Sequence, residues 1–266
     1  MRIAHFSDLH FGRIAHPRVV EALVREVNAG DVDLAVLSGD LTQRARHREF
    51  AAAQDMLAAL DPPVLVVAGN HDVYPWWRPY RRLATPLRRY RRYVTDDLAP
   101  TYADDAAAVL GITSAIGASI KGGRVGRADR AAIRTYFRDV EPGAFKVLVL
   151  HHHLTEMRSL GPHDIAGQAR RTLDVAAEVG IDLILCGHLH VSLIEPVQIV
   201  PGAPRIVIAS AGTATSNRWR APHGRTNFYN VITVADDAFE IEERRYVPAD
   251  QQFVRDSTTR FDRVSA

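Results

Sequence analysis

The sequence predicts an α/β fold, and two observations carry that prediction. Short apolar segments at 2–6, 34–37 and 64–68 alternate with stretches at 18–27 and 50–60 in which apolar residues recur at helical spacing. Strands that lack a polar face are typical of a parallel sheet covered on both sides. The intervening helices then serve as crossovers between parallel strands.

The same alternation returns in the second half of the chain and then changes. We expect further strands at 109–113, 146–150 and 183–186, and helices at 127–138 and 168–179. Near the C-terminus, Phe239 and Ile241 alternate with Glu240 and Glu242, which is the period of a half-exposed strand. The last third is therefore expected to be antiparallel.

Three regions are expected in the 266 residues. Residues 1–248 should form a single domain that contains every motif described below. Within it, residues 74–95 are rich in arginine and aromatic residues, and Pro79 and Pro86 interrupt them, so we expect a helical, cap-like insertion. Residues 249–266 are polar and are expected to form a tail that is loose or packs on a partner.

The composition excludes some classes of protein. Lys plus Arg is 33 and Asp plus Glu is 31, so a nucleic-acid partner is not expected from charge. The single cysteine, Cys186, rules out an internal disulfide and fits a reducing compartment; it lies in a predicted strand and should be a packed thiol. No signal-peptide pattern opens the chain, and no apolar run approaches the roughly 18 residues of a membrane span, so we expect a cytoplasmic protein.

Five predicted strands end in side chains that could bind metal. These are Asp8 and His10, Asp40, Asn70 and His71, His151, and His188 and His190. The carboxyl ends of parallel strands lie along one edge of a sheet, so these side chains should converge. Carboxylates, an amide and imidazoles without a thiolate suit manganese, iron, cobalt or zinc.

The number of candidate ligands is too large for one ion. A single D-x-H or G-N-H-D segment would more often be a turn or a helix cap, but five such strand endings together favour a metal site. Two ions about 3.5–4 Å apart, with one carboxylate between them, would use the seven candidates other than His71 well. Such a centre keeps a net positive charge, which suits a phosphodiester anion.

The motifs occur in a characteristic order: D-x-H at 8–10, G-D at 39–40, G-N-H-D at 69–72, histidine at 151 and G-H-x-H at 187–190. This set resembles the calcineurin-like metallophosphoesterases, and the resemblance spans residues 1 to about 235. It implies a four-layer α-β-β-α sandwich of two mixed β-sheets flanked by helices. It also implies a dinuclear metal site at the C-terminal edge of the strands.

The resemblance assigns a role to each motif residue. The first metal would be held by Asp8, His10 and His190, the second by Asn70, His151 and His188, and Asp40 would bridge them. The ions would be manganese, iron or zinc, including mixed Fe/Mn or Fe/Zn pairs. They would activate a water for attack on phosphorus. His71 would contact the phosphoryl or leaving oxygen and act as general acid, and Asp72 would orient its ring.

Residues within the motifs favour one branch of the family. The G-D-L-T at 39–42 and the G-N-H-D differ from the G-D-x-V-D-R-G and G-N-H-E of protein phosphatases, and most resemble bacterial class III cyclic-nucleotide phosphodiesterases. The implied function is hydrolysis of small phosphodiesters, including 3′,5′-cyclic nucleotides, in a possible homodimer. The alternatives are a phosphomonoesterase or a DNA exonuclease of the same family, or a non-catalytic scaffold.

Residues outside the metal motifs give weaker indications of substrate binding. His152 follows a predicted ligand, whereas Thr213 and Asn217 lie in a polar loop whose side chains suit phosphate or ribose. All three are predicted substrate contacts. The segment 78–92 contains seven arginines, of which we expect at most one or two to attract substrate while the others are solvated.

Overall fold

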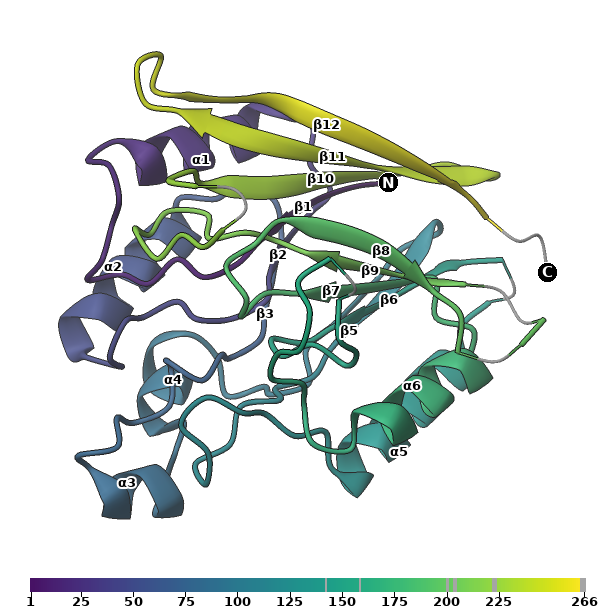
Figure 1. Cartoon of the computed structure of the whole chain (residues 1–266), viewed down its shortest axis with the longest axis horizontal. Coiled ribbons are helices and arrows are strands. Elements are labelled where there is room, and N and C mark those ends of the chain that lie inside the picture. The colour runs from purple at the N-terminus through teal and green to yellow at the C-terminus, as the bar shows by residue number, and fades with distance from the viewer. Residues whose placement is uncertain (142, 158, 200, 203–204, 222–223, 264–266) are drawn as a thin grey trace.

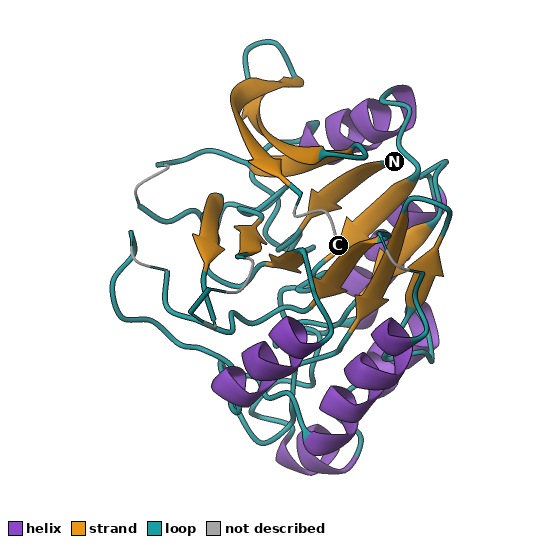
Figure 2. Ribbon diagram, turned by 90° about the vertical axis from the view of Figure 1, so that its right-hand side faces the viewer, coloured by secondary structure: helices purple, strands orange, loops and turns teal. Residues whose placement is uncertain are grey.

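The computed structural model describes residues 1–266 except 142, 158, 200, 203–204, 222–223 and 264–266. Two six-stranded sheets lie face to face, and helices cover their outer sides (Figure 1, Figure 2). This is the predicted α/β architecture of two mixed sheets flanked by helices, which is confirmed.

The first sheet has the order β12-β11-β10-β1-β2-β3. Its strands are β1 (Arg2–Phe6), β2 (Leu34–Leu37), β3 (Val64–Val66), β10 (Phe228–Val234), β11 (Ala238–Val247) and β12 (Gln252–Asp262). β1, β2 and β3 are parallel, whereas β10 is antiparallel to β1 and begins an antiparallel run to the edge. These antiparallel strands lie in the last third of the chain, where the sequence pattern predicted an antiparallel arrangement.

The second sheet has the order β4-β5-β6-β7-β9-β8. Its strands are β4 (Thr101–Ala103), β5 (Ala107–Gly111), β6 (Phe145–Val149), β7 (Leu183–Cys186), β8 (Leu193–Val197) and β9 (Ile206–Ser210). The four central strands are parallel and the two edge strands are antiparallel. The strands that end in predicted metal ligands thus belong to two sheets, not to the single parallel sheet that strand patterns alone suggested.

The helices are α1 (Val19–Ala29), α2 (His47–Ala58), α3 (Pro79–Ala84), α4 (Arg88–Tyr93), α5 (Arg127–Arg138) and α6 (Ala169–Glu178). α1 and α2 pack on the outer face of the first sheet, and α5 and α6 on that of the second. No helix among the described residues is both long and apolar enough to cross a membrane.

Successive side chains of a strand point to opposite faces of its sheet. They form three apolar layers, one between the sheets and one under the helices on each side. In β2, Leu34 and Val36 point into the layer between the sheets, while Ala35 and Leu37 point toward the helices. All four side chains are buried, because each face of the strand has a partner. A run of apolar residues without polar alternation therefore correctly predicted a strand that is buried on both faces.

The C-terminal segment is an edge strand, which corrects the predicted polar tail. β12 pairs with β11 from Ala238–Asp262 to Val247–Gln252, and Phe253 is only 2% exposed. Its ring packs against Tyr229 and Tyr246, with centroids 5.0 and 5.2 Å away. An edge strand with one face in water is mostly polar, so its composition resembles that of a tail. The final residues, 264–266, lie outside the described part.

Truncating Phe253 tests whether this edge strand contributes to stability. Phe253→Ala is expected to lower the free energy of unfolding by about 3–5 kcal/mol, because a buried aromatic ring leaves a cavity. Urea unfolding followed by circular dichroism measures this. Arg260→Ala, on the exposed face of the same strand, is the control and should change stability by less than about 0.5 kcal/mol. Equal small effects of both variants would show that β12 does not pack as described.

The region predicted as a cap divides into two parts. Pro86 lies between the two short helices, since α3 ends at Ala84 and α4 begins at Arg88. α4 belongs to the body of the protein, because Tyr90 is fully buried and its hydroxyl donates to the Val66 carbonyl at 3.0 Å. α3 protrudes instead, and Tyr80 on it is 83% exposed.

Candidate metal centre

The predicted ligands converge where the two sheets present the carboxyl ends of their strands, on the left of Figure 1. The loops that follow β1, β2 and β3 meet those that follow β6 and β7. In one group, the ligand atoms of four buried side chains all lie within 4.8 Å of one another. These four are Asp8, His10, Asp40 and His190.

The backbone of this site adopts a conformation that ordinary residues avoid. Five of the seven predicted ligands have positive φ, namely Asp8 at 55°, His10 at 46°, Asp40 at 57°, His188 at 71° and His190 at 59°. For a residue with a side chain such a conformation costs on the order of 1–3 kcal/mol and persists where the surrounding structure fixes it. Strain of this kind concentrated at the ends of three strands is typical of a functional site.

Glycines in the motifs allow these loops to touch. A Cβ on Gly187 would overlap the Ser7 hydroxyl and lie 2.6 Å from Oδ2 of Asp8. A Cβ on Gly69 would overlap the Asp40 carboxylate. Both glycines are therefore required by close approach of a neighbouring loop.

Gly187→Ala is expected to displace Asp8 and to reduce the bound metal to one ion per chain or fewer. The cause is steric, because the added methyl group meets both Ser7 and Asp8. Metal analysis of purified protein measures it. Gly167→Ala is the matched control, since its Cβ would make ordinary contacts at 3.5 Å or more. Full metal content in Gly187→Ala would contradict the described geometry.

At the first metal position, two ring nitrogens and a carboxylate oxygen from three buried side chains face one another. Nδ1 of His10 and of His190 donate to the carbonyls of Thr42 and Arg218, at 3.3 and 2.6 Å. Their Nε2 atoms, which then carry lone pairs, are 3.1 Å apart. Oδ1 of Asp8 lies 3.0 Å from Nε2 of His190 and is without an assigned hydrogen bond within the described part of the chain. This cluster of lone pairs fits a cation.

The second position has the same character. His151 donates from Nδ1 to the Ser38 carbonyl at 2.7 Å, and its Nε2 points at Oδ1 of Asn70, 3.2 Å away. The amide nitrogen of Asn70 donates to the Ile120 carbonyl, which turns Oδ1 inward. Nδ1 of His188 lies 3.1 Å from the same oxygen. Amide oxygen and imidazole nitrogens converge here as ligands.

Asp40 lies between the two positions. Its Oδ2 is 3.6 Å from Nε2 of His10 and 3.3 Å from Nε2 of His151, while Oδ1 accepts the backbone N–H of His71 at 2.8 Å. Burial would raise the pKa of this carboxyl, but His151 and His71 hold it well below its usual range. A charged carboxylate shared by two histidine sets has the geometry of a bridging ligand.

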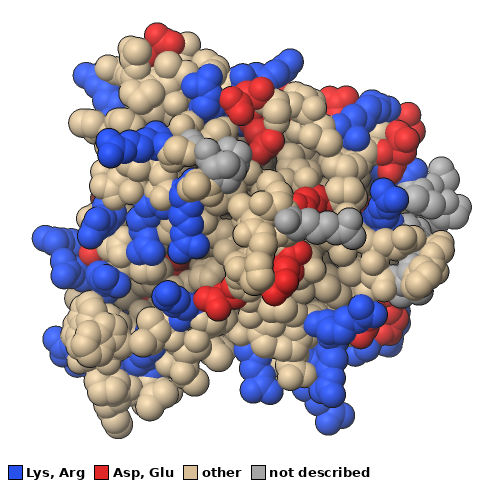
Figure 3. Space-filling view, in the orientation of Figure 1, with Lys and Arg blue, Asp and Glu red and all other residues tan. Residues whose placement is uncertain are grey.

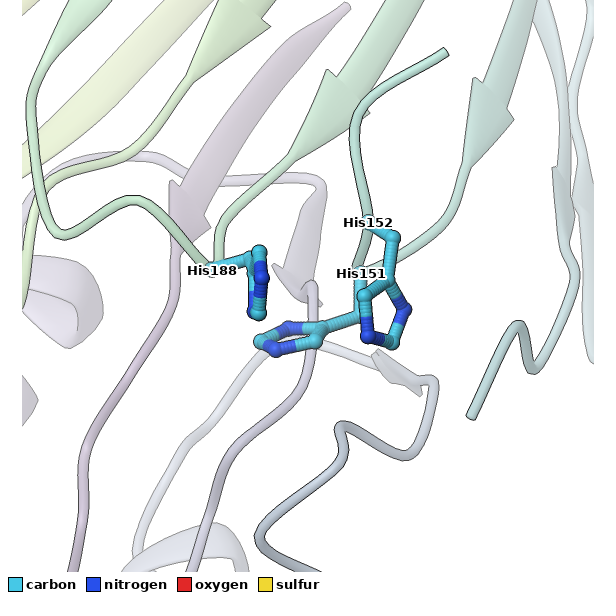
Figure 4. A group of neighbouring side chains, drawn as sticks. All are labelled: His151, His152 and His188. Carbon is cyan, nitrogen blue, oxygen red and sulfur yellow. The ribbon is translucent and has the colours of Figure 1, made fainter. Parts of the chain in front are cut away.

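His152 packs beside the second position without a free ligand atom. His151, His152 and His188 lie together in Figure 4, and the ring centroids of His152 and His188 are 4.6 Å apart. Both ring nitrogens of His152 are nevertheless engaged, with the Ser114 hydroxyl and the Lys121 carbonyl at 2.9 Å. His152 therefore supports its neighbours, and Asn70 is the better ligand.

The three residues that the sequence predicted to contact substrate do not line the cavity. His152 is 1% exposed, and Thr213 is buried and donates its hydroxyl hydrogen to the Asp8 carbonyl at 2.7 Å. Asn217 is exposed. None of the three lines the described cavity beside the metal positions. These contacts are corrected: Thr213 and His152 shape the site from behind.

The structure also corrects the partner of the His71 ring. Nδ1 of His71 donates to the Gln43 carbonyl at 2.8 Å. The carboxylate of Asp72 instead accepts the backbone N–H groups of Leu41, Thr42 and Gly69 at 2.9–3.2 Å. Asp72 therefore holds the turn that carries His71, and Gln43 fixes the ring.

A cavity of about 450 Å³ opens beside both metal positions. Asp40, Asn70, His71, His188 and His190 contribute to its wall. Sequence reasoning missed Gln43 and Arg218, which also line it. The basic Arg218-Trp219-Arg220 segment was the available signal, because it follows a polar loop close to the last histidine motif.

Comparison with known proteins supports the family suggested by these motifs. The profile of the calcineurin-like phosphoesterase family matches residues 1–192. The chain belongs to this family. Over 116 residues it is 32% identical to the glycerophosphodiester phosphodiesterase GpdQ of Enterobacter lignolyticus (strain SCF1). That match covers 37% of this chain and 41% of the relative, so it spans less than half of either protein.

Solved structures confirm the fold. Purple acid phosphatase PPD1 from yellow lupin superposes with a TM-score of 0.73 over 98% of this chain and 53% of that one, at 10% identity. GAP50, the anchor in the inner membrane complex of Plasmodium, gives 0.61 over 98% of this chain and 88% of that one, also at 10% identity. A phosphatase and an anchor share the fold, so the function has to be argued from the site.

Proposed function

We propose that the protein is a metal-dependent phosphodiesterase that hydrolyses small phosphodiesters at a dinuclear centre. The observation that carries this proposal is the pair of lone-pair clusters that share Asp40 and open into one cavity. The metals are manganese, iron or zinc, including mixed pairs. The similarity to GpdQ supports a diester substrate, and glycerophosphodiesters and 3′,5′-cyclic nucleotides are the first candidates.

The chain's own residues prepare the site for this reaction. When bound, the two ions would supply Lewis acidity, which lowers the pKa of water and offsets the charge of the phosphoryl group. Asp8, His10 and His190 would hold one ion, and Asn70, His151 and His188 the other. Asp40 holds its Oδ2 between both histidine sets.

His71 is the remaining candidate for proton transfer. Its ring lies beside that of His10, with centroids 4.8 Å apart, and Gln43 fixes Nδ1 so that Nε2 is the free nitrogen. Burial lowers the pKa of His71 to about 4, so Nε2 is an acceptor at neutral pH without ligand. The negative charge of a bound phosphoester raises this pKa and would allow Nε2 to donate to the leaving oxygen.

The test is the ratio of kcat/KM for bis(p-nitrophenyl) phosphate and p-nitrophenyl phosphate, measured with manganese-loaded protein in one buffer. We expect the diester to be preferred, and glycerophosphodiesters and cyclic AMP would be compared next. A preference for the monoester would identify a phosphatase instead. No turnover of either compound by metal-loaded protein would favour the scaffold interpretation.

A further inference from the structure

The cavity beside the metal positions is lined by more cations than one phosphodiester requires. Five cationic side chains line it and only two carboxylates do, of which Asp40 belongs to the metal site. The cations are Arg44, Arg82, Lys121, Arg218 and Arg220. Figure 3 shows Lys and Arg side chains gathered on the left of the molecule, over the edge where the strands end.

One of these cations is structural. Arg82 donates to the carbonyls of Tyr74 and Ser119, so it ties the segment around α3 to the neighbouring loop. Its side chain is buried and its donors are used. Arg82 is therefore set aside as a ligand contact.

The other arginines of the cavity have weak partners or none among the described residues. Nη1 of Arg218 has a long contact of 3.5 Å with Oε1 of Gln43, and the guanidinium of Arg44 lies 5.8 Å from the centre of the Trp77 ring. For Arg220 no side-chain partner is found within the described part of the chain. No carboxylate of a described residue forms an ion pair with any of the three.

Some surface arginines elsewhere in the protein form ion pairs, whereas others, such as Arg48, form none among the described residues. Arg134 lies 2.9 Å from Glu178, Arg170 lies 3.0 Å from Asp174, and Arg245 lies 2.9 Å from Asp256. The cations of the cavity differ in being gathered in one concave site, where like charges repel and raise the energy of the folded protein. Unpaired cations that surround a cavity are arranged for an anion that enters it.

Arg218 joins this cation group to the metal centre. Its carbonyl accepts Nδ1–H of His190 at 2.6 Å, and its contact Gln43 also fixes the His71 ring. The Arg218 side chain is half-buried and lines the same cavity as His71.

We propose that Arg44, Arg218 and Arg220 bind a second phosphoryl group of the substrate, so that preferred phosphodiesters carry a further phosphate besides the scissile one. This inference rests on the proposed phosphodiesterase function. The scissile diester has one negative charge, which the metal centre offsets. A second phosphate supplies the charge for which the arginines have no partner, and guanidinium groups bind phosphate oxygens in pairs.

The test uses two substrates that differ only in this phosphate. They are the 5′-(p-nitrophenyl phosphate) of thymidine and the same compound with a 3′-phosphate, which share scissile bond and leaving group. With metal-loaded protein we expect kcat/KM to be about 10- to 100-fold higher for the doubly phosphorylated compound. Equal values, or a preference for the compound without the 3′-phosphate, would overturn the proposal.

Variants locate the effect. Arg220→Gln and Arg218→Gln should each reduce the preference at least several-fold, by lowering kcat/KM more for the doubly phosphorylated compound. Arg218→Gln keeps the carbonyl that His190 uses, and metal analysis checks this. Arg48→Gln, which removes an exposed charge on α2 outside the cavity, is the control and should keep the preference. An equal loss on both compounds would mean that the arginines contact the scissile phosphate, which contradicts the proposal.

A binding measurement separates this proposal from the proposed function. Calorimetry compares thymidine 3′,5′-bisphosphate with thymidine 5′-monophosphate on the metal-loaded protein. We expect the bisphosphate to bind about tenfold more tightly or better, and Arg220→Gln to remove most of the difference. This outcome would support the second site even if neither diester were hydrolysed. Equal affinities would overturn the second site even in an active phosphodiesterase.

Discussion

Replacing His71 by alanine is expected to lower kcat for a diester by about 10²- to 10⁴-fold while both metal ions remain bound. The ring lies beside the ligand His10 and is held by the Gln43 carbonyl, so its free Nε2 can exchange a proton with the substrate. It does not complete either group of ligands. The backbone N–H of residue 71, which donates to Oδ1 of Asp40, is unchanged by the substitution.

Two measurements on the same preparation test this prediction. Elemental analysis gives the metal content. Hydrolysis of bis(p-nitrophenyl) phosphate gives kcat. His47→Ala is the control, because His47 is exposed on α2 and does not line the cavity; it should retain wild-type turnover. Loss of both metals in His71→Ala would make His71 a ligand, and wild-type turnover would exclude it from catalysis.

Asp40→Asn is expected to have the larger effect on metal binding. The carboxylate is the only charged group common to both metal positions among the described residues, and asparagine keeps its shape but not its charge. Losing a group that only orients a metal ligand costs about 10- to 100-fold in affinity. Loss of the shared charged ligand should cost more, so both ions should be lost in dilute metal, and turnover with them.

Calorimetric titration with manganese and thermal unfolding with and without the metal measure the effect. Wild-type protein should gain thermal stability when metal is added, because the metal binds only the folded state. Asp40→Asn should gain little. The control is Asp164→Asn, the other carboxylate of the cavity, which should bind two ions as wild type does. Two tightly bound ions in Asp40→Asn would show that Asp40 is not the bridge.

The metal ligands could be predicted because each is fixed by local sequence. Every one lies within a few residues of the end of an apolar strand, as Asp8 and Asp40 do, and the parallel arrangement of strands brings such ends together. The glycines of the motifs allow neighbouring loops to pack closely, because they have no Cβ atom. That a second sheet supplies His151 and His188 was implied by family resemblance and not by periodicity.

The residues around the ligands could not be predicted in the same way. The ring of His71 is held by the carbonyl of Gln43, and His152 by a hydroxyl 38 residues earlier, so neither contact has a local pattern. The role of Asp72 was predicted wrongly because adjacency in sequence suggested a contact that the turn does not make. β12 was missed because an edge strand needs few apolar residues, here chiefly Phe253 and Phe261.

The most direct test of the dinuclear centre is a titration of metal-free protein with Mn²⁺, followed by calorimetry and by hydrolysis of bis(p-nitrophenyl) phosphate in parallel. The described site predicts two ions bound per chain, and turnover that is absent in the metal-free protein and complete when both positions are filled. A single ion at saturation, or full activity with a chelator present, would contradict it.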